Sequence, residues 1–447
     1  MHSLHRSYTH PGTNLVVQGF ISFSPNGIHV VTHSHRSFLK NFLTGAVFTL
    51  PLVYIVLYST PSFLSYTNLA AFQAHRTSTS PPLPPPQAWQ QCDYTTGKWV
   101  WDGSVTGPRY DSENCDMKST EKCVSNGKPD NGYLNWRWQQ AGCNLSELDP
   151  AEFLRAVRGK LLAFVGDSTA RNQAESLVCF LSTVSRPETT HRYEEPVGHE
   201  FWRWVFPAPH NVTISTYWSP FLVRAEGRSV DYAMTQETLF LDALTEPWTA
   251  DVDAMDVMVI SAGHWFNHPA VYYDDGQIAG VFSRPDVNET DIGGGYVGVY
   301  RKVIRRVLEY VNEKSSGDKL VVVSTIAPAH FDARYAWNHR DACSRPNPYD
   351  EGEVPEDANT AEMRKAVLEE GAAAKRQRRG LRFDVLDVTR LASMRPDGHP
   401  GAYIVKDRYC AGKPMPETVN NDCLHWCAPG PVDTFNDILV QMVAASG

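Results

Sequence analysis

The sequence predicts an α/β fold with a central parallel sheet and helices on both faces. Four short apolar runs have the length of buried strands, and longer stretches with apolar residues at helical spacing separate them. Such alternation is typical of a three-layer, doubly wound domain. The expected strands are Leu161–Val165, Asp256–Ser261, Leu320–Ile326 and Leu381–Val388, and the expected helices are Glu152–Arg158, Ala170–Leu181, Tyr300–Lys314 and Thr360–Arg378.

The N-terminal segment lacks this alternation. Residues 1–40 are polar and rich in histidine, and we expect a cytosolic tail. Residues 41–60 start with an uncharged, mostly apolar stretch close to the ~20 residues that span a bilayer, so we expect one membrane helix. Arg36 and Lys40 precede it and no basic residue follows until Arg76, which by the positive-inside rule places the N-terminus in the cytosol. A cleaved signal peptide is the alternative, but the apolar stretch starts late and has no clean cleavage site.

The next segment has features of a protein in an oxidising compartment. Residues 61–90 include a run of Ser, Thr and Pro that we expect to form an extended stem. All nine cysteines follow it, which favours disulfides, and their odd number leaves at least one unpaired. Zinc is the rival explanation, but no Cys-x-x-Cys pair supports it. Three triplets match the N-glycosylation pattern: Asn144-Leu-Ser, Asn211-Val-Thr and Asn288-Glu-Thr.

Residues 91–145 contain four cysteines and four tryptophans, and we expect a small disulfide-tied module. Tryptophans in such a module either fill its thin core or stack on sugar rings, and the first role is the more common. We expect residues 146–447 to form a single larger domain. The four tryptophans are Trp99, Trp101, Trp136 and Trp138.

The stretch from Leu161 to Asn172 contains the candidate nucleophile. Its apolar run breaks at Gly166 and Asp167, and Ser168 then stands at a strand-to-helix corner. This corner lies at the carboxyl edge of the sheet, where open α/β folds place their sites, and backbone N–H groups at the helix start can stabilise developing negative charge. Such a corner suits acyl transfer. The alternative is that Ser168 serves only as the helix N-cap.

A motif near the C-terminus supplies the partners that a serine nucleophile needs. Asp422 precedes His425 by three residues, and Cys423 and Cys427 could clamp the loop. His425 would accept the proton of Ser168, and Asp422 would hold the imidazole in the required tautomer. The chain order of serine, aspartate and histidine fits a serine esterase or acyltransferase.

Other stretches could line the site. Gly263 and His264 follow an expected strand, so the Gly263 N–H could join an oxyanion hole, although His264 could equally be a satisfied core histidine. Arg395-Pro-Asp-Gly-His-Pro400 could also contribute, or could form only a turn. No Walker motif indicates a nucleotide, Gly293-Gly-Gly295 is expected to be a loop, and the histidines are not spaced as metal ligands. The net charge of −9 gives no support for a nucleic-acid partner.

Five separated motifs follow one another along the chain: Cys92-Asp-Tyr-x-x-Gly-Lys-Trp-Val, Asn126-Gly-Lys-Pro-Asp-x-x-Tyr-Leu-x-Trp-Arg-Trp138, Val165-Gly-Asp-Ser-x-x-Arg-Asn-Gln173, Ser261-Ala-Gly-His-Trp and Asp422-Cys-x-His-Trp-Cys-x-Pro-Gly430. Together they resemble the motifs of the plant trichome birefringence-like proteins. The resemblance runs from Cys92 to the C-terminus. Five motifs in one order are far more specific than any one of them.

The resemblance implies a type II Golgi membrane protein with a lumenal catalytic domain related to SGNH esterases. It implies transfer of acetyl groups to hydroxyls of a cell-wall polysaccharide, with Ser168, Asp422 and His425 as the triad. Arg171 and Asn172, one helical turn from Ser168, would hold the oxyanion or the sugar. No bound cofactor is implied, and the acetyl donor is a co-substrate whose identity the sequence does not define.

The family pattern also implies a substrate branch and four disulfide bonds. Thr169-Ala170 and Phe266 depart from the residues usual in the family, but neither change touches the triad. Ser261–Phe266 together with Arg395–Pro400 is most similar to the branch associated with xyloglucan acetylation. The implied pairs are Cys92 with Cys143, Cys115 with Cys179, Cys123 with Cys427, and Cys343 with Cys423, which leaves Cys410 free.

Three functions are compatible with the sequence. The first is an O-acetyltransferase that acts on a hemicellulose, xyloglucan first and xylan or mannan as alternatives, through an acetyl-serine intermediate. The second is a polysaccharide acetylesterase with the same triad, in which water takes the acetyl group. The third is a wall-binding protein whose Trp-rich module binds glycan. For the first we expect an aromatic and polar groove beside Ser168 that positions the acceptor.

Overall fold

The computed structural model describes residues 21–24, 27–30, 93–140, 145, 147, 149–193, 201–287, 295–377, 380–409 and 414–444. The chain divides into two units, Met1–Leu83 and Pro84–Gly447. In the first unit, β1 (Ile21–Ser24) pairs antiparallel with β2 (Gly27–Val30). The expected membrane helix and stem lie outside the described residues. Within the described part of the chain, no helix has both the length and the apolar character needed to cross a membrane.

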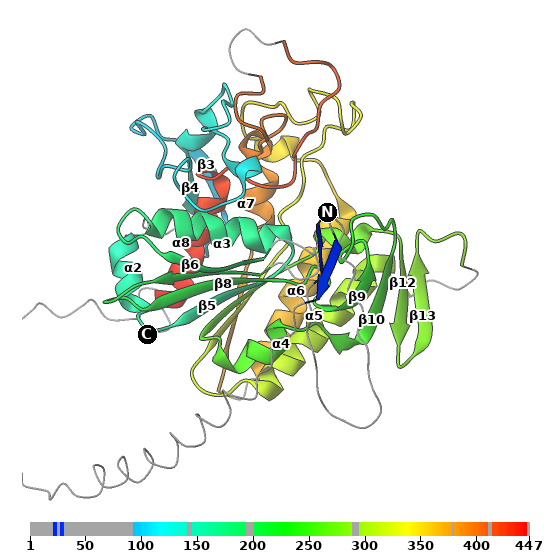
Figure 1. Cartoon of the computed structure of the whole chain (residues 1–447). Helices are drawn as coiled ribbons and strands as arrows, with labels where there is room; N and C mark the ends of the chain where they lie inside the picture. The colour runs from blue at the N-terminus through cyan, green and yellow to red at the C-terminus, as the bar shows by residue number, and fades with distance from the viewer. Residues whose placement is uncertain are drawn as a thin grey trace, which may run out of the picture. The chain divides into compact units, whose positions relative to one another are not determined.

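A seven-stranded sheet forms the centre of the second unit (Figure 1). Its order is β15-β14-β11-β5-β8-β7-β6, and the first five strands are parallel neighbours. The prediction of an α/β domain with a central sheet is confirmed, but β7 and β6 pair antiparallel at one edge, so the sheet is mixed. The strands are β5 (Leu161–Gly166), β6 (Glu188–Tyr193), β7 (Phe201–Phe206), β8 (Val212–Trp218), β11 (Val257–Ser261), β14 (Leu320–Ser324) and β15 (Arg382–Leu386).

Helices cover both faces of this sheet because its central strands are apolar on both sides. In β5, Leu162 and Phe164 pack with the core that includes α3 and α8, whereas Ala163 and Val165 pack with the core that includes α5 and α6. Figure 1 shows α2, α3 and α8 on one side of the sheet and α4, α5 and α6 on the other. The helices are α2 (Pro150–Ala156), α3 (Ser168–Leu181), α4 (Trp248–Asp251), α5 (Gly295–Lys314), α6 (Ala358–Gln377), α7 (Thr389–Ser393) and α8 (Pro431–Ala444).

A second sheet, which the sequence analysis did not anticipate, packs beside the central one. Its order is β13-β12-β10-β9. Only β10 and β12 are parallel, and both outer strands pair antiparallel. β9 and β10 alternate buried and exposed or half-buried side chains, β13 is mostly exposed, and β12 is only five residues long, so none of them produces a long apolar run. Their bounds are β9 (Val223–Gly227), β10 (Glu237–Leu244), β12 (Ala270–Asp274) and β13 (Gln277–Phe282).

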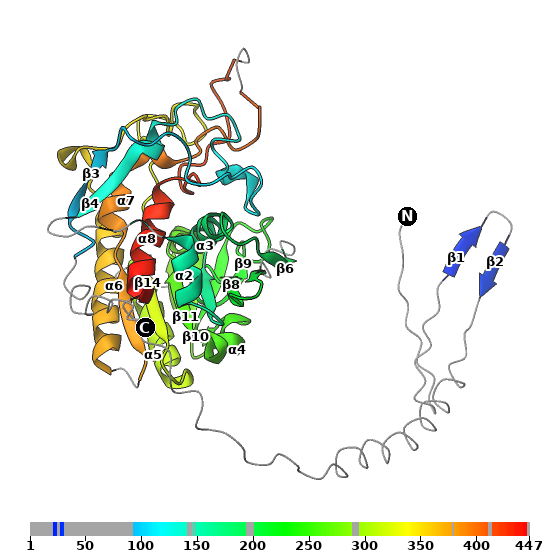
Figure 2. The same cartoon turned by 90° about the vertical axis from the view of Figure 1, so that its left-hand side faces the viewer.

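The N-terminal module is a hairpin, β3 (Gly97–Trp101) with β4 (Trp136–Gln140), joined by a long loop. Trp99 lies opposite Trp138 in this hairpin, and both indoles are buried. Trp99 Nε1 also donates to the carbonyl of Leu391 in α7, at 2.9 Å. Figure 2 shows the hairpin beside α7 at one end of the domain. These two indoles therefore fill the junction between the module and the catalytic domain, whereas Trp101 is 54% exposed.

Three disulfide bonds connect segments that are distant in the sequence. They are three of the four pairs that the family resemblance implies, and the fourth pair and Cys410 lie outside the described residues. Asn211 is exposed in the turn between β7 and β8, while Asn144 and Asn288 also fall outside the described part. The bonds join Cys115 to Cys179, Cys123 to Cys427, and Cys343 to Cys423.

Candidate active site

The strand-to-helix corner after β5 depends on a glycine. Gly166 has φ +153°, and a Cβ atom placed on it would lie 1.7 Å from the carbonyl oxygen of Ser261 in the neighbouring strand β11. Only glycine allows β5 and β11 to approach this closely at the point where the chain turns into α3. Ser168 is the first residue of α3. The serine therefore stands where the parallel strands end, as predicted.

Asp167, and not Ser168, caps this helix. Asp167 Oδ1 accepts hydrogen bonds from the Thr169 amide at 2.9 Å and from the Thr169 hydroxyl at 2.6 Å. The alternative role for Ser168, an N-cap, does not hold, because the helix starts two residues earlier than predicted. Gly263 also differs from expectation, since its N–H donates to Asp167 Oδ2 at 3.0 Å. This amide holds the capping carboxylate in place and is not a free donor for an oxyanion.

Asp422 and His425 form the pair that the sequence predicted. His425 Nδ1 lies 2.8 Å from Asp422 Oδ2, while Asp422 Oδ1 accepts the backbone N–H groups of Leu424 and His425 at 3.1 and 2.9 Å. Burial opposes ionisation of Asp422, but the charge and hydrogen bonds of His425 hold the pKa of this carboxyl well below its usual value. Burial alone would lower the pKa of His425, and the Asp422 carboxylate raises it above 6.5. His425 Nε2 is buried and accepts or donates no hydrogen bond among the described residues.

Asn172 connects the serine helix to the histidine loop. Its amide oxygen accepts the Trp426 N–H at 2.8 Å, and its amide nitrogen donates to the Trp426 carbonyl at 3.1 Å. Asn172 follows Ser168 by four residues, so both lie on one face of α3. Because Trp426 directly follows His425, this double hydrogen bond brings the histidine to the helix face that carries the serine. The loop that carries Asp422 and His425 is therefore fixed to the helix that begins with Ser168.

The N-terminal module contributes a residue that the sequence analysis missed. Glu121 is fully buried, and its two carboxylate oxygens accept hydrogen bonds from Arg171 Nη2 and Asn172 Nδ2, both at 2.8 Å. Its backbone carbonyl accepts the Ala428 N–H at 3.0 Å. The disulfide between Cys123 and Cys427 closes the same contact. The pairing of Cys123 with Cys427 that the family resemblance implies could have revealed this contact. Glu121 lies two residues before Cys123, and His425 lies two residues before Cys427.

Arg171 and Asn172 consequently differ from their expected roles. The amide of Asn172 is shared between Glu121 and Trp426, and the guanidinium of Arg171 forms ion pairs with Glu121 and, at 3.5 Å, with Glu175. These partners are buried, so leaving them would cost several kcal/mol. Both residues therefore hold the module and the histidine loop on α3. They are not arranged to bind an oxyanion or a sugar.

His264 lies beside the triad without belonging to it. Its Nε2 is 2.9 Å from the carbonyl of Ala327, and because a carbonyl only accepts, this nitrogen carries the proton. Burial lowers the pKa of His264 below 6.5, so the ring is neutral at neutral pH. Together with Thr169 and Trp426 it lines a small cavity of about 20 Å³. No group of three or more His, Cys, Asp or Glu side chains in the described ranges is arranged to hold a metal ion.

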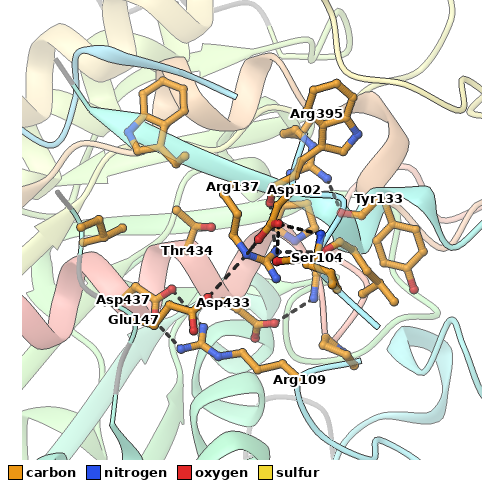
Figure 3. Close-up of a pocket in the computed structure, with 18 of the residues that line it drawn as sticks. Asp102, Ser104, Arg109, Tyr133, Arg137, Glu147, Arg395, Asp433, Thr434 and Asp437 are labelled. Carbon is orange, nitrogen blue, oxygen red and sulfur yellow. Dashed lines mark hydrogen bonds and ion pairs between the residues drawn. The ribbon is translucent and has the colours of Figure 1, made fainter. Parts of the chain in front are cut away.

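A larger cavity of about 370 Å³ lies between the module and the start of α8 (Figure 3). Several of its charged side chains are paired with one another. Arg109 binds Asp437 through two hydrogen bonds of 2.8 and 3.0 Å, and Arg137 lies 3.6 Å from Glu147. None of the triad candidates lines this cavity. It is a polar junction between module and domain, separate from the candidate active site.

Comparison with known families agrees with this geometry. The model of the PC-Esterase family, described as a GDSL/SGNH-like acyl-esterase family found in Pmr5 and Cas1p, matches residues 145–442. The PMR5 N-terminal domain matches residues 90–144. The chain belongs to the PC-Esterase family. Its Gly-Asp-Ser corner and its Asp422–His425 pair therefore lie within the region that matches an acyl-esterase family.

Among PC-Esterase proteins, the chain is similar to members of the trichome birefringence-like family, to which it also belongs. Xyloglucan O-acetyltransferase 1 of Populus trichocarpa is 41% identical over 88% of this chain and 91% of its own length. Xyloglucan O-acetyltransferase 1 of Arabidopsis thaliana is 44% identical over 79% of this chain and 80% of its own. Protein trichome birefringence-like 26 of Arabidopsis thaliana is 34% identical over 92% of this chain and 87% of its own length.

The raised pKa of His425 gives a pH prediction for this PC-Esterase protein. A neutral His425 is needed to accept a proton, so hydrolysis of 4-nitrophenyl acetate should rise with pH through a midpoint above 6.5. In Asp422→Asn the charge that raises this pKa is gone and burial lowers it, so the midpoint should move below 6.5 and the plateau rate should fall about 10⁴-fold. Asp275→Asn, in the exposed turn between β12 and β13, is the control. An unchanged midpoint in Asp422→Asn would contradict the pairing.

Glu121 gives a stability prediction. Glu121→Ala leaves Arg171 and Asn172 without their buried partner and should lower the free energy of unfolding by about 3 kcal/mol. The rate of 4-nitrophenyl acetate hydrolysis should fall with it, since the same contacts hold the histidine loop. Glu113→Ala, in the same module but exposed, should leave the free energy of unfolding close to that of the unchanged chain. Urea unfolding of the full chain measures both, and equal losses would argue against a structural role for Glu121.

Proposed function

We propose that this chain is an O-acetyltransferase that moves acetyl groups onto hydroxyls of xyloglucan through an acetyl-serine on Ser168. The observation that carries the proposal is the Asp422–His425 pair, whose Nε2 has no partner among the described residues and lies at the edge where Ser168 begins α3. The names of the xyloglucan O-acetyltransferases at 41 and 44% identity support the reaction and the acceptor.

The proposed reaction has two steps. His425 Nε2 takes the proton of the Ser168 hydroxyl as its oxygen attacks the acetyl carbonyl, and the imidazolium then protonates the leaving group of the donor. In the second step His425 takes the proton of a sugar hydroxyl, which attacks the acetyl-serine, and returns that proton to the Ser168 oxygen. Asp422 stabilises the imidazolium in both steps. The positive end of the α3 helix dipole, where Ser168 stands, stabilises the developing oxyanion.

The acceptor surface is proposed to include the loop after β14. Phe331, Tyr335 and Trp337 on this loop are exposed by 46, 38 and 64%. Asn421 Nδ2, next to the triad aspartate, donates to the carbonyls of Trp337 and His339 at 3.2 and 2.6 Å. Figure 1 shows this loop (yellow) close to the segment that precedes α8 (orange to red). Exposed aromatic rings beside the triad offer apolar faces on which sugar rings can stack.

Two alternatives use the same fold differently. A polysaccharide acetylesterase would have the same triad, with water in place of the sugar hydroxyl, and xylan or mannan could replace xyloglucan as the acceptor. A wall-binding protein with an idle triad has less support. Its binding surface would be the Trp-rich module, in which Trp99 and Trp138 are buried.

We also propose that the enzyme is a type II Golgi membrane protein. Residues 41–60 would be the anchor, residues 61–90 the stem, and the catalytic domain would lie in the lumen. The three disulfide bonds support an oxidising compartment. A glycan on the exposed Asn211 would support the lumenal orientation.

The function is tested by acetyl transfer with matched acceptors. We expect the full chain, given 4-nitrophenyl acetate, to add one acetyl mass to xyloglucan oligosaccharides and not to xylan or mannan oligosaccharides. Ser168→Ala should abolish the gain because no acetyl-serine can form. Mass spectrometry of the oligosaccharides and an assay of free acetate are the measurements. Acetate release without any oligosaccharide gain would establish the esterase, and full transfer by Ser168→Ala would exclude the acetyl-serine route.

The acceptor surface gives a separate prediction. Trp337→Ala removes an exposed indole from the proposed stacking surface and should raise KM for the xyloglucan oligosaccharide by about tenfold, the equivalent of ~1.4 kcal/mol of stacking. KM for 4-nitrophenyl acetate should not change. Trp101→Ala is the matched control, because Trp101 is similarly exposed but lies on β3 of the module. An equal effect of both substitutions would place acceptor binding elsewhere.

A further inference from the structure

Two histidines, His399 and His330, form a chain of contacts to the backbone of His425. His399, from the Arg395–Pro400 motif, is buried, and its Nδ1 is 2.8 Å from the carbonyl oxygen of His425. Its Nε2 is 2.7 Å from Nδ1 of His330, and Nε2 of His330 is 3.0 Å from the carbonyl oxygen of Ser393. The two rings thus form a continuous chain of polar contacts that ends on His425. Neither histidine has a step in the proposed reaction.

The hydrogen bonds of this chain require an additional proton. Both outer nitrogens face carbonyl oxygens, which only accept, so His399 Nδ1 and His330 Nε2 must carry hydrogen. A neutral imidazole has only one N–H, so two neutral rings would place two lone pairs against each other at 2.7 Å. A third proton between these nitrogens replaces that repulsion with an N–H···N hydrogen bond. Three protons on four ring nitrogens satisfy all three contacts.

We propose that His399 is a positioning residue for His425, and that it acts through a proton shared with His330. The inference rests on the catalytic role proposed for His425. The shared proton fixes the orientation of the His399 ring, and the ring then holds the carbonyl of His425 in place. Asp422 fixes the same histidine from the side-chain end, and Asn172 fixes the next residue. His425 is therefore held at both its ring and its backbone.

Burial and the nearby charged side chains act in opposite directions on the positive charge that the shared proton brings. Burial lowers the pKa of His330 to about 4 and that of His399 well below 6.5. Lys128 and Arg395 add positive charge nearby, while Asp397 and Asp422 supply negative charge. Asp397 is itself ion-paired with Arg395 at 2.8 Å, and Asp422 is paired with His425 at 2.8 Å, but the charge of Asp422 still raises the pKa of His399.

Aromatic contacts also stabilise the positive charge of the shared proton. The ring of His399 stacks on Trp426 with centroids 4.3 Å apart and an angle of 25°. His330 meets the same indole edge-on at 6.0 Å and lies 6.1 Å from Tyr349. A cation over the face of an indole is attracted by its π electrons, and more strongly where water is excluded. The indole of Trp426 and the charge of Asp422 thus both favour a proton shared by the two rings.

The first experiment counts protons and needs no activity. The full chain, with ¹⁵N in its histidine rings, should show three ring N–H signals from His330 and His399 at neutral pH, including one N–H···N proton far downfield. His330→Asn should remove the downfield signal and leave a single N–H on His399, because the side-chain amide can donate to His399 Nε2 without an added proton. Only two N–H signals in the unmodified pair would overturn the shared proton.

The second experiment compares two substitutions of the positioning residue. His399→Leu removes the donor to the His425 carbonyl and should lower kcat for 4-nitrophenyl acetate roughly 10- to 100-fold, the loss that a displacement of about 1 Å produces. His399→Asn keeps a donor at the Nδ1 position and should recover most of kcat. Both lose the contact with His330, so a purely structural role would affect both alike. Equal kcat values in the two variants would overturn the positioning role.

These outcomes separate the inference from the proposed function. Turnover that persists in Ser168→Ala would refute the acetyl-serine mechanism and leave the N–H count intact. Two N–H signals together with normal acetyl transfer would refute the shared proton alone. Near-ultraviolet circular dichroism of both His399 variants checks that the tryptophan environment is kept.

Discussion

The ion pair and hydrogen bond of the Glu121 carboxylate are the interaction on which the rest of the site depends. A carboxylate without exposure to water is stable only when its oxygens are paired, and Arg171 and Asn172 supply both partners. Asn172 also binds the residue after His425. The helix that begins with Ser168 and the loop that carries His425 are thereby both fixed to the module. On the proposed mechanism, a domain without this module would have the three catalytic residues without the contacts that hold His425 to the helix of Ser168.

A second buried carboxyl, Glu175, lies beside this interaction. Burial, and then the nearby Glu121 carboxylate, raise the pKa of Glu175 well above its usual value. The Arg171 guanidinium lies 2.8 Å from Glu121 and 3.5 Å from Glu175. Of the charges that act on His425, Asp422 has the largest effect on its pKa, while Glu121 and Arg171 act in opposite directions. Asp422 is therefore the group that mainly sets the pKa of the histidine that the proposed mechanism uses as its base.

Local patterns allowed much of this structure to be predicted. The strands β5, β11 and β14 are short apolar runs, β15 lies in a stretch that is apolar apart from its charged residues, and the Ser168 corner and the Asp422–His425 pair lie within single motifs. Strand β7, next to the edge strand β6, was missed because it buries only alternate side chains, with Arg203 between Trp202 and Trp204. The partners of Arg171, Asn172 and Gly263 were missed for another reason. Each lies on a different element, and no local pattern reports which distant group a side chain or amide will meet.

The disulfide between Cys123 and Cys427 can form only late in synthesis, because the two cysteines are 304 positions apart in the sequence. During synthesis, Cys427 leaves the ribosome only after the module and the described strands and helices that precede α8 have been made. A nascent or truncated chain therefore displays Ser168 before His425 is anchored to the module. On the proposed mechanism such a chain is inactive, and acyl transfer begins only when oxidation has joined Cys427 to Cys123.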